Sequence, residues 1–306
     1  MPVKTNLSIV IPTYNNKCAD LVRQLHGQAR LLADEGLHFE ILVGDDGSTD
    51  DFLAANRVIN TLSGCRYLER GFNSGRAAIR NFLAQEARYD WLLFLDADML
   101  VVNDQFLRRY LEQPGDELVI DGGVCIPTDE HGQWSSNLRY LYERAAAGHY
   151  GADQRQKNPY HDFHTANFLI SRQLMLRHPF DERFRRYGYE DVLLGKQLCQ
   201  DRISIRHIDN PVGFSSFEPN DSFVGKTEEG LQTLHQFRHE LRGYSRILTA
   251  AEGIHSGAVL AAIRLWHGLF GRLERRNLCG SHPNLSLFKL YKLGYYLTLT
   301  KKTKSL

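Results

Sequence analysis

The stretch Trp91–Met99, WLLFLDADM, decides how the rest of the chain is interpreted. Its first five residues are apolar without alternation, and the run ends at Asp96. A short apolar run bounded by polar residues is typical of a strand buried on both faces of a parallel sheet. Asp96 and Asp98 would then stand at the strand's end. Paired carboxylates of this kind are typical ligands of Mg²⁺ or Mn²⁺, which share their other positions with phosphates; alternatively, they are solvated turn residues.

Strands and helices alternate along the chain. Apolar, β-branched runs predict further strands over residues 7–11, 39–43, 65–68 and 168–170, the first of them stopped by Pro12. Apolar residues at helical spacing predict helices over 18–35, 76–88, 138–147 and 227–251, with another opening at Asp50 and with Thr227 capping the last. This alternation implies an α/β fold with a mostly parallel, doubly wound sheet.

Polar clusters stand at the ends of three predicted strands: residues 12–15, the pair Asp45 and Asp46, and residues 96–98. In doubly wound sheets ligands bind beyond the carboxyl ends of the strands, so the fold itself would bring these clusters together. The first turn lacks the dinucleotide-binding glycine pattern, and the sequence contains no G-x-x-x-x-G-K-[ST] loop. Dinucleotide and P-loop nucleotide chemistry are therefore not expected.

Composition is that of an ordinary globular protein. Of 306 residues, 42% are hydrophobic and 24% charged. The five cysteines form no C-x-x-C pair, which favours a reducing compartment over a disulfide framework or a zinc cluster. The first apolar run is too short for a signal peptide, and no stretch approaches the roughly 18 apolar residues of a membrane span. We therefore expect a cytoplasmic protein.

Charge is unevenly distributed along the chain. Residues 254–306 carry nine Lys or Arg and one acid, a net +8, against −7 for residues 1–253. The aromatic residues of this basic tail are Trp266, Phe270, Phe288, Tyr291, Tyr295 and Tyr296. Such a segment can lie on the anionic inner face of a membrane, as a peripheral contact; alternatively, it is a helical pair packed on the core. Because the main body is acidic, nucleic-acid binding is not expected.

Two arginines and an aromatic segment are further candidates for ligand contacts. Arg76 and Arg80 lie four residues apart, hence on one helix face, and could meet a pyrophosphate; alternatively, they pair on the surface with Glu69 or Glu86. Residues 122–159 are rich in aromatics, of which Trp134 is a candidate sugar contact because sugar rings stack on aromatic faces. These aromatics could equally pack the segment onto the sheet.

Four motifs occur in order: IVIPTYNN (9–16), VGDDGSTD (43–50), FNSGRAAIRN (72–81) and FLDADM (94–99). Together they resemble the family 2 glycosyltransferases of the GT-A fold. The resemblance is tight over residues 6–110 and continues through HTANFLISR (164–172) and FRRYGYEDVLLG (184–195). It implies inverting transfer of a sugar from a nucleotide diphosphate sugar, with Mn²⁺ or Mg²⁺ as cofactor.

The resemblance also implies roles for the residues of the nucleoside site. Pro12, Tyr14 and Asn15 would border the nucleoside. Asp46 would read the base, often through uracil N3–H, and Asp45 would shape the same loop. This match favours a UDP-sugar as donor over a GDP- or dTDP-sugar.

For the phosphates and the reaction, the resemblance implies a second set of roles. Arg80 would lie near the phosphates and the D-x-D. Asp98 would be the direct metal ligand, and Asp96 would lie nearer the ribose or the metal's waters. Inversion needs one base and no enzyme nucleophile. Of the pair Glu190 and Asp191, Asp191 is the expected base and Glu190 a supporting acceptor contact; the alternative is a plain helix N-terminus.

The sugar and acceptor contacts are less defined by sequence. His164, Asn167 and Tyr189 are candidate contacts to the donor sugar or the acceptor. His207 stands early in its segment, and Phe214 occupies a position where related sequences often carry a histidine. Whether a histidine completes the metal shell therefore stays open.

The expected organisation is a catalytic domain over 1–225, with a donor half (1–110) and an acceptor half (111–225), followed by a basic helical extension over 226–306. The expected acceptor is a saccharide or lipid-linked saccharide of surface polysaccharide synthesis. Two rivals remain. A non-catalytic sugar-nucleotide or glycan-binding module would have no need of a base. A nucleotidyltransferase would need a glycine-rich basic first loop, where this chain has IPTYNN.

Overall fold

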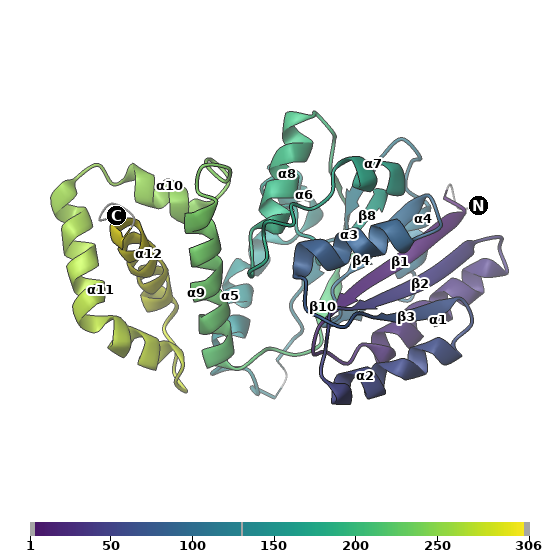
Figure 1. The fold of residues 1–306 in the computed structure, drawn as a ribbon, viewed down its shortest axis with the longest axis horizontal. Coiled ribbons are helices and arrows are strands. Elements are labelled where there is room, and N and C mark those ends of the chain that lie inside the picture. The colour runs from purple at the N-terminus through teal and green to yellow at the C-terminus, as the bar shows by residue number, and fades with distance from the viewer. Residues whose placement is uncertain (1–3, 130, 303–306) are drawn as a thin grey trace. The chain divides into compact units, whose positions relative to one another are not determined.

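The structure, a computed structural model, describes residues 4–129 and 131–302 (Figure 1). The chain forms two compact units, which are taken in turn below. Unit 1 comprises Met1–Pro127, Gly148–Arg185 and Leu194–Ser215. Unit 2 comprises Thr128–Ala147, Arg186–Leu193 and Ser216–Leu306.

A seven-stranded sheet forms the centre of unit 1, in the order β3-β2-β1-β4-β8-β6-β9. Its strands are β1 (Asn6–Thr13), β2 (His38–Asp45), β3 (Cys65–Glu69), β4 (Trp91–Leu95), β6 (Val119–Asp121), β8 (Asn167–Ser171) and β9 (Arg206–His207). Strands β1 to β4 are mutually parallel, and β8 is antiparallel to both of its neighbours. The predicted mostly parallel α/β sheet is confirmed. Three short strands, β5 (Met99–Val101), β7 (Val124–Cys125) and β10 (Val212–Phe214), make a second sheet.

Strand β1 is longer than the sequence predicted. It continues through Pro12, which lies opposite Gly44 in β2. Strand β4 flanks β1 only as far as Val10. Beyond that point β1 is an edge on one side, and proline is tolerated at an edge because its missing N–H is not needed there.

Helices cover the sheet of unit 1 (Figure 1). They are α1 (Ala19–Ala33), α2 (Asp50–Asn56), the 3₁₀ turn η1 (Arg57–Thr61), α3 (Arg76–Glu86), α4 (Phe106–Leu111), α6 (Ala152–Arg155), α7 (Arg172–Arg177) and most of α8 (Glu190–Gln200). One apolar core joins strand residues such as Phe94 and Phe168, whose rings stack 4.8 Å apart, to Leu83 of α3 and Leu198 of α8. Helix α3 is thereby fixed against the strands whose ends carry the polar clusters.

A buried polar network holds the far strands of this sheet. Arg155 donates to Asp121 (2.7 Å), and its guanidinium lies 2.7 Å from His207 Nδ1. His207 Nε2 lies 2.9 Å from the carbonyl of Pro159. Since Arg155 has only donors, this arrangement requires a neutral imidazole with its proton on Nε2. Burial lowers the pKa of His207, in agreement with that neutral form.

Unit 2 is helical. It contains α5 (Leu138–Ala146), α9 (Asn220–Gln236), α10 (Arg246–Gly253), α11 (Gly257–Leu278) and α12 (Leu285–Lys302); the 3₁₀ turn η2 (Ala147–His149) follows α5. Its core joins Leu138, Phe223, Leu278, Phe288 and Tyr291. Among the described residues, no helix is long and apolar enough to cross a membrane.

The helix predicted over 227–251 is wrong. Helix α9 starts seven residues earlier, directly after Pro219, and ends at Gln236. Thr227 is not a cap: it lies inside α9, where its hydroxyl donates to the carbonyl of Phe223 (2.9 Å), one turn back. The chain then turns, with Gly243 at φ +82°, before α10 begins.

The network around His207 predicts a pH dependence of stability. Because the folded state lowers the pKa of His207 from 6.5, the unfolded chain binds more protons below that pH. The free energy of unfolding should therefore fall as pH falls below about 6.5, by at most about 1.4 kcal/mol per pH unit for this one proton, and the melting temperature should fall with it.

The control variants separate His207 from other titrating groups. His207→Gln should flatten the pH dependence of the melting temperature, and His38→Gln, at an exposed site, should leave it unchanged. Burial also lowers the pKa of His235, so some dependence should survive in the first variant. Equal slopes in His207→Gln and the unmodified protein would contradict the assignment.

Candidate functional site

The three polar clusters predicted from sequence stand at one edge of the sheet of unit 1. Strands β1, β2 and β4 are parallel, so their carboxyl ends, at Thr13, Asp45 and Leu95, point the same way. The backbone N–H of Asp46 donates to the carbonyl of Thr13 (2.9 Å), which joins the first two clusters directly. This edge is where parallel sheets bind ligands.

Asp45 is fully buried and holds its own loop. One of its carboxylate oxygens accepts from the N–H of Ser48 (2.7 Å), and the other accepts from the hydroxyl of Tyr67 (2.5 Å). Burial, followed by this hydrogen bond, raises the pKa of Tyr67. Asp45 therefore acts on the site through the loop that it shapes.

Asn15 ties the loop after β1 to the same segment. Its backbone N–H donates to the hydroxyl of Ser48 (2.7 Å), and its side-chain oxygen accepts from the N–H of Thr49 (3.0 Å). Asn15 adopts φ 49°, a left-handed conformation that asparagine tolerates better than most residues. The IPTYNN and DDGST loops thus form one hydrogen-bonded unit.

Asp46 joins this unit to helix α3. Its carboxylate accepts from the N–H groups of Ser74 (2.9 Å) and Gly75 (2.8 Å) and from the hydroxyl of Ser74 (2.6 Å). The side chain is buried, so three of its four acceptor positions are used inside the protein. Gly47, at φ +82°, allows the approach: a Cβ there would lie 2.6 Å from the carbonyl carbon of Phe72.

Helix α3 aims two arginines at the end of β4. Arg80 donates to one oxygen of Asp96 (2.6 Å), and Arg76 donates to the other (3.1 Å). The Arg80 side chain is 1% exposed and that of Arg76 is 42% exposed. The alternative pairing with Glu69 or Glu86 is wrong: Glu69 pairs with Arg57, and Glu86 with Arg66.

Asp98 presents its side chain on the surface beside this cluster. It is an exposed residue, and Asp96 is half-buried. Ser215, just after β10, holds the backbone carbonyl of Asp98 through both its N–H (3.0 Å) and its hydroxyl (2.7 Å). Phe214 is buried in β10. The neighbour that fixes the D-x-D turn is therefore a serine.

The start of β8 reaches the same edge. The N–H of Asp96 donates to the carbonyl of Ala166 (3.0 Å), which places residues 164–167 next to the D-x-D turn. Asn167 itself is buried: its amide donates to the carbonyls of Gly123 and Asn210 (both 2.9 Å) and accepts from Tyr110 (2.7 Å). Asn167 thus supports the backbone at this edge and does not present its amide to solvent.

Two exposed aromatics stand on the loops of this edge. Tyr14 is 52% exposed and Phe72 is 63% exposed, with the guanidinium of Arg70 lying 5.2 Å from the Phe72 ring. Sequence analysis singled out Tyr14 but missed Phe72. A signal was present, because Phe72 is an aromatic residue at the start of a motif whose next three residues, NSG, are typical of a loop.

The predicted acid pair Glu190 and Asp191 begins helix α8, in the part of the chain that belongs to unit 2. The turn before it is strained, with Gly188 at φ +90° and Tyr189 at φ +71°. Thr233 of α9 donates to the carbonyl of Tyr187 (3.0 Å) and so helps to hold the turn.

Burial differs along this turn. Burial raises the pKa of Tyr189 to about 12. Glu190 is buried, whereas Asp191 is half-exposed. Left-handed backbone at a tyrosine is uncommon and is often found at functional sites.

Trp134, the candidate sugar contact, packs inside unit 2. Its ring lies 5.1 Å from that of Phe217 and 5.6 Å from that of Tyr140. It is half-buried in this aromatic cluster. For Trp134, these contacts therefore favour the interpretation that the aromatic segment serves packing.

The donor set at the strand ends fits a hard cation. Within residues 4–129 and 131–302 there is no group of three or more His, Cys, Asp or Glu able to hold a metal by itself. Mg²⁺ and Mn²⁺ do not need one, because they bind through one or two carboxylates and complete their shells with water and phosphate oxygens. Asp98, with Asp96 beside it, meets that requirement.

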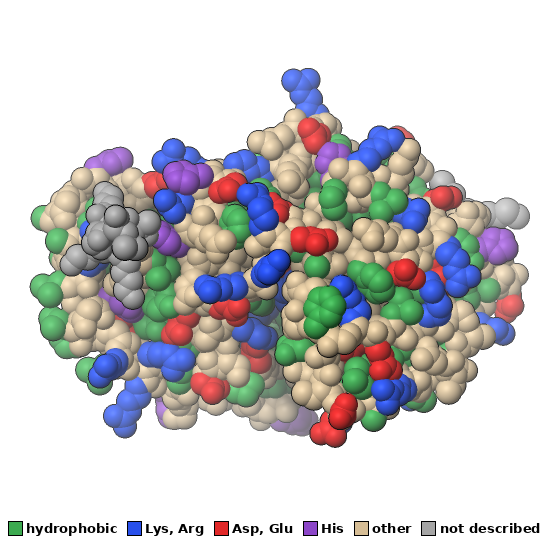
Figure 2. Space-filling model, viewed as in Figure 1, with side chains coloured by type: hydrophobic (Ala, Val, Ile, Leu, Met, Phe, Trp, Pro, Cys, Tyr) green, Lys and Arg blue, Asp and Glu red, His purple; other side chains and the backbone are tan. Residues whose placement is uncertain are grey.

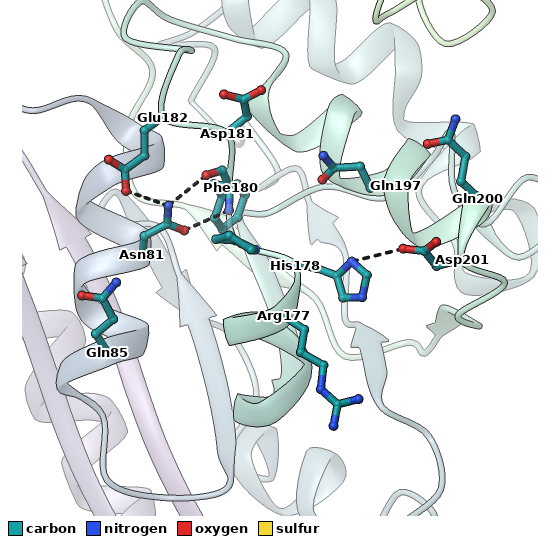
Figure 3. Close-up of a pocket in the computed structure, with 11 residues that line it drawn as sticks. Asn81, Gln85, Arg177, His178, Phe180, Asp181, Glu182, Gln197, Gln200 and Asp201 are labelled. Atoms are coloured by element: carbon teal, nitrogen blue, oxygen red, sulfur yellow. Dashed lines mark hydrogen bonds and ion pairs between the residues drawn. The ribbon is translucent and has the colours of Figure 1, made fainter.

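A separate pocket of unit 1 is lined by none of the candidate site residues (Figure 3). Its cavity of about 570 Å³ is walled by the C-terminal parts of α3 and α8 and by residues 177–182. Asn81 of α3 binds both the N–H and the carbonyl of Phe180 (2.9 Å each). Phe180 in turn lies 5.5 Å from the guanidinium of Arg80. One wall of the pocket thereby supports the buried arginine.

The arrangement around Asp96 predicts a large loss of stability for Arg80→Leu. The change removes the buried partner of a half-buried carboxylate, which should cost about 3 kcal/mol of unfolding free energy. The measurement is chemical denaturation. Arg57→Leu, which breaks an exposed pair with Glu69, should change stability little.

A second change tests the cause. Adding Asp96→Asn to Arg80→Leu should restore part of the lost stability, because the carboxylate that lost its buried partner, and keeps only the half-exposed Arg76, is then uncharged. Equal losses for Arg80→Leu and Arg57→Leu, or no recovery in the double variant, would contradict the role given to the pair.

Solved structures of other proteins have a fold similar to that of this chain. A mannosyltransferase from Pyrobaculum calidifontis, solved with GDP-Man and Mn²⁺, matches with a TM-score of 0.57 at 14% identity, over 95% of this chain and 84% of that one. TarS of S. aureus, solved with UDP, matches with a TM-score of 0.51 at 16% identity, over 98% and 91%. At these identities the likeness concerns the fold, which is that of GT-A glycosyltransferases.

Sequence relatives point the same way. The chondroitin synthase of Escherichia coli is 23% identical over 252 residues, which are 70% of this chain and 35% of that protein. The chain thus spans about a third of the length of this relative. The model of the family described as "Glycosyl transferase family 2" matches residues 8–177, more than half of the chain. The protein belongs to glycosyl transferase family 2.

Proposed function

We propose that the protein transfers a sugar, with inversion, from a nucleotide diphosphate sugar to a saccharide or lipid-linked saccharide acceptor, with Mn²⁺ or Mg²⁺ as cofactor. The observation that carries the proposal is the cluster at the end of β4. There, two arginines hold Asp96 while Asp98 stands exposed beside it. Arginine and a carboxylate-bound cation are the groups that stabilise a departing diphosphate.

Asp98 is proposed as the direct ligand of the metal, and Asp96 as the residue nearer the ribose or the metal's waters. The metal, when bound, neutralises charge on the diphosphate. Arg76 is the arginine that can turn to a phosphate, since it is half-exposed, whereas Arg80 is buried against Asp96 and acts by positioning it. Ser215 keeps the turn in place through the Asp98 carbonyl.

For the nucleoside, the exposed rings of Tyr14 and Phe72 are the proposed contacts, with Pro12 and Asn15 shaping the loop between strands. Aromatic rings can stack on the flat face of any base. Asp46 is engaged by Ser74 and Gly75, so base reading by Asp46 would use its one remaining acceptor position. The fold relatives were solved with GDP-Man and with UDP; uracil remains the proposed base on the strength of the motif.

Asp191 is the proposed base that takes the proton from the acceptor hydroxyl, and Glu190 supports the acceptor. Asp191 is half-exposed at the start of α8, after a strained turn, where a carboxylate can meet a ligand. His164, Tyr189, Asn167 and Trp134 stay proposed neighbours of the sugars, the last two mainly through the structure that they support. The name of the E. coli relative supports a polysaccharide as acceptor. All five cysteines are free, which supports action in the cytoplasm.

Donor binding can be tested by thermal shift with UDP, GDP and dTDP, each with and without Mn²⁺. Binding to the native state adds about 2.7 kcal/mol to the free energy of unfolding when the ligand is at a hundred times Kd, and this raises the melting temperature. We expect the largest rise for UDP with Mn²⁺. Asp98→Ala should remove the metal-dependent part of the rise, and Asp104→Ala, at an exposed acid just after β5, should not. Equal shifts with and without metal in the unmodified protein would contradict the metal site.

The proposed base is tested separately from the donor. Asp191→Asn should keep the nucleotide-dependent thermal shift and lower the transfer rate by roughly a hundredfold or more, since a positioned base contributes about that much. The matched control is Asp221→Asn, an exposed acid in the first turn of α9. Donor binding without transfer in the unmodified protein, across saccharide acceptors, would favour a binding module. Loss of transfer in both variants would remove Asp191 from its role.

A further inference from the structure

Helix α11 turns an apolar face to solvent. Six large apolar side chains lie along it at helical spacing, each between 38% and 65% exposed: Val259, Leu265, Trp266, Leu269, Phe270 and Leu273. Hydrophobic side chains are visible along the left margin of Figure 2, where Figure 1 places α11. A surface helix of a globular protein normally turns its charged residues outward and its apolar stripe inward. Over residues 257–271, helix α11 does the reverse.

Arg264 and His267, the polar residues among the first fifteen of α11, face α12. Arg264 donates to the carbonyl of Leu297 (3.1 Å) and to the hydroxyl of Thr300 (3.2 Å). His267 Nδ1 lies 2.9 Å from the carboxylate of Glu274, which is buried. From Gly257 to Gly271, Arg264 and His267 are the only ionisable residues in the sequence.

Close packing prevents the helix from rolling over. A Cβ at Gly294 of α12 would lie 2.8 Å from the Cβ of His267, so the two helices touch backbone to side chain at this point. The indole N–H of Trp266 donates to Glu274 (2.8 Å), which fixes the ring at the boundary of the two faces. The apolar face is therefore a built feature of unit 2.

Positive charge accompanies the apolar face. Arg272 and Arg276 are exposed at its C-terminal end, and Lys289 is exposed at the start of α12. The single acid of residues 254–306, Glu274, is buried, and the segment has a net charge of +8. An apolar stripe beside exposed cations is complementary to a surface of lipid tails beneath anionic headgroups.

We propose that α11 docks in the interfacial layer of a membrane that contains anionic lipids, with its long axis along the surface. With 22 residues the helix is about 33 Å long, and amphipathic helices of this kind lie in the plane of the interface and do not cross it. Trp266 and Phe270, whose rings are 4.5 Å apart, are placed to enter the headgroup region, where aromatic side chains are favoured.

A second copy of the chain fits this face less well. A stable interface buries roughly 800 Å² on each partner, whereas the six apolar side chains are each only 38% to 65% exposed. Pairing two such faces would also bring two segments of net charge +8 together. The proposal is independent of the donor, the acceptor and the proposed base.

Vesicle flotation of the full chain tests the proposal. We expect flotation with vesicles containing about a third phosphatidylglycerol in phosphatidylcholine, and little with phosphatidylcholine alone. Leu265→Gln with Leu269→Gln should weaken binding roughly tenfold or more, because two apolar anchors are lost. Leu31→Gln, at a 70% exposed leucine of α1, should leave binding unchanged.

The charge contribution has its own matched pair. Arg272→Gln with Arg276→Gln should weaken binding to anionic vesicles several-fold for each arginine and reduce its salt dependence. Arg30→Gln with Arg177→Gln makes the same change of net charge at exposed sites of unit 1 and should have a smaller effect. Equal effects of the two pairs would overturn the local role of α11.

Two readouts distinguish lipid from protein partners. Brominated lipids should quench tryptophan fluorescence, and Trp266→Phe should abolish that quenching. Light scattering after size exclusion should give a monomer. Absence of flotation with anionic vesicles would overturn the proposal, as would a dimer that Leu265→Gln with Leu269→Gln dissociates. Unchanged melting temperatures of the variants ensure that lost binding is not lost folding.

Discussion

The ion pairs of Asp96 with Arg76 and Arg80 are the interaction on which the candidate donor site depends. A carboxylate at the end of a strand buried on both faces is partly removed from water, so it must be paired. The partners come from α3, and the position of α3 is set by Asp46, which binds the first N–H groups before the helix. The carboxylates of Asp96 and Asp46 therefore hold the strand end, the loop and the helix together.

The two arginines differ in how freely their side chains can move. Arg80 is buried and lies 5.5 Å from the Phe180 ring, so it has little freedom to leave Asp96. Arg76 is half-exposed and lies at the first position of α3, where the helix dipole also favours an anion. A diphosphate arriving at this edge would thus meet one movable cation and one fixed cation. The fixed one holds Asp96 in its orientation, and the half-exposed one has room to turn toward a ligand.

Sequence predicted the sheet and the convergence of its strand ends because both follow from local patterns. The apolar run of β4 and the alternation of strands and helices suffice for that. Asp46 shows where such reasoning stops: its partners are 28 and 29 residues away, and nothing local reveals that its oxygens are used inside the protein. The prediction of where α9 starts was wrong for a different reason. Thr227 followed by acids has the pattern of a cap, but packing of the preceding turn extends the helix through it.

The composition of the basic C-terminal helices does not by itself decide between two structures. Both the membrane-surface and the packed-pair interpretations rested on the same aromatic residues, and the structure divides them. Phe288 and Tyr291 of α12 are buried in the core of unit 2, while Trp266 and Phe270 of α11 are exposed. The deciding contacts are a glycine that lets the helices touch and a buried glutamate that gathers the polar side chains. Because α12 already fills the interior, the apolar residues of α11 have no protein surface left within unit 2 to cover them.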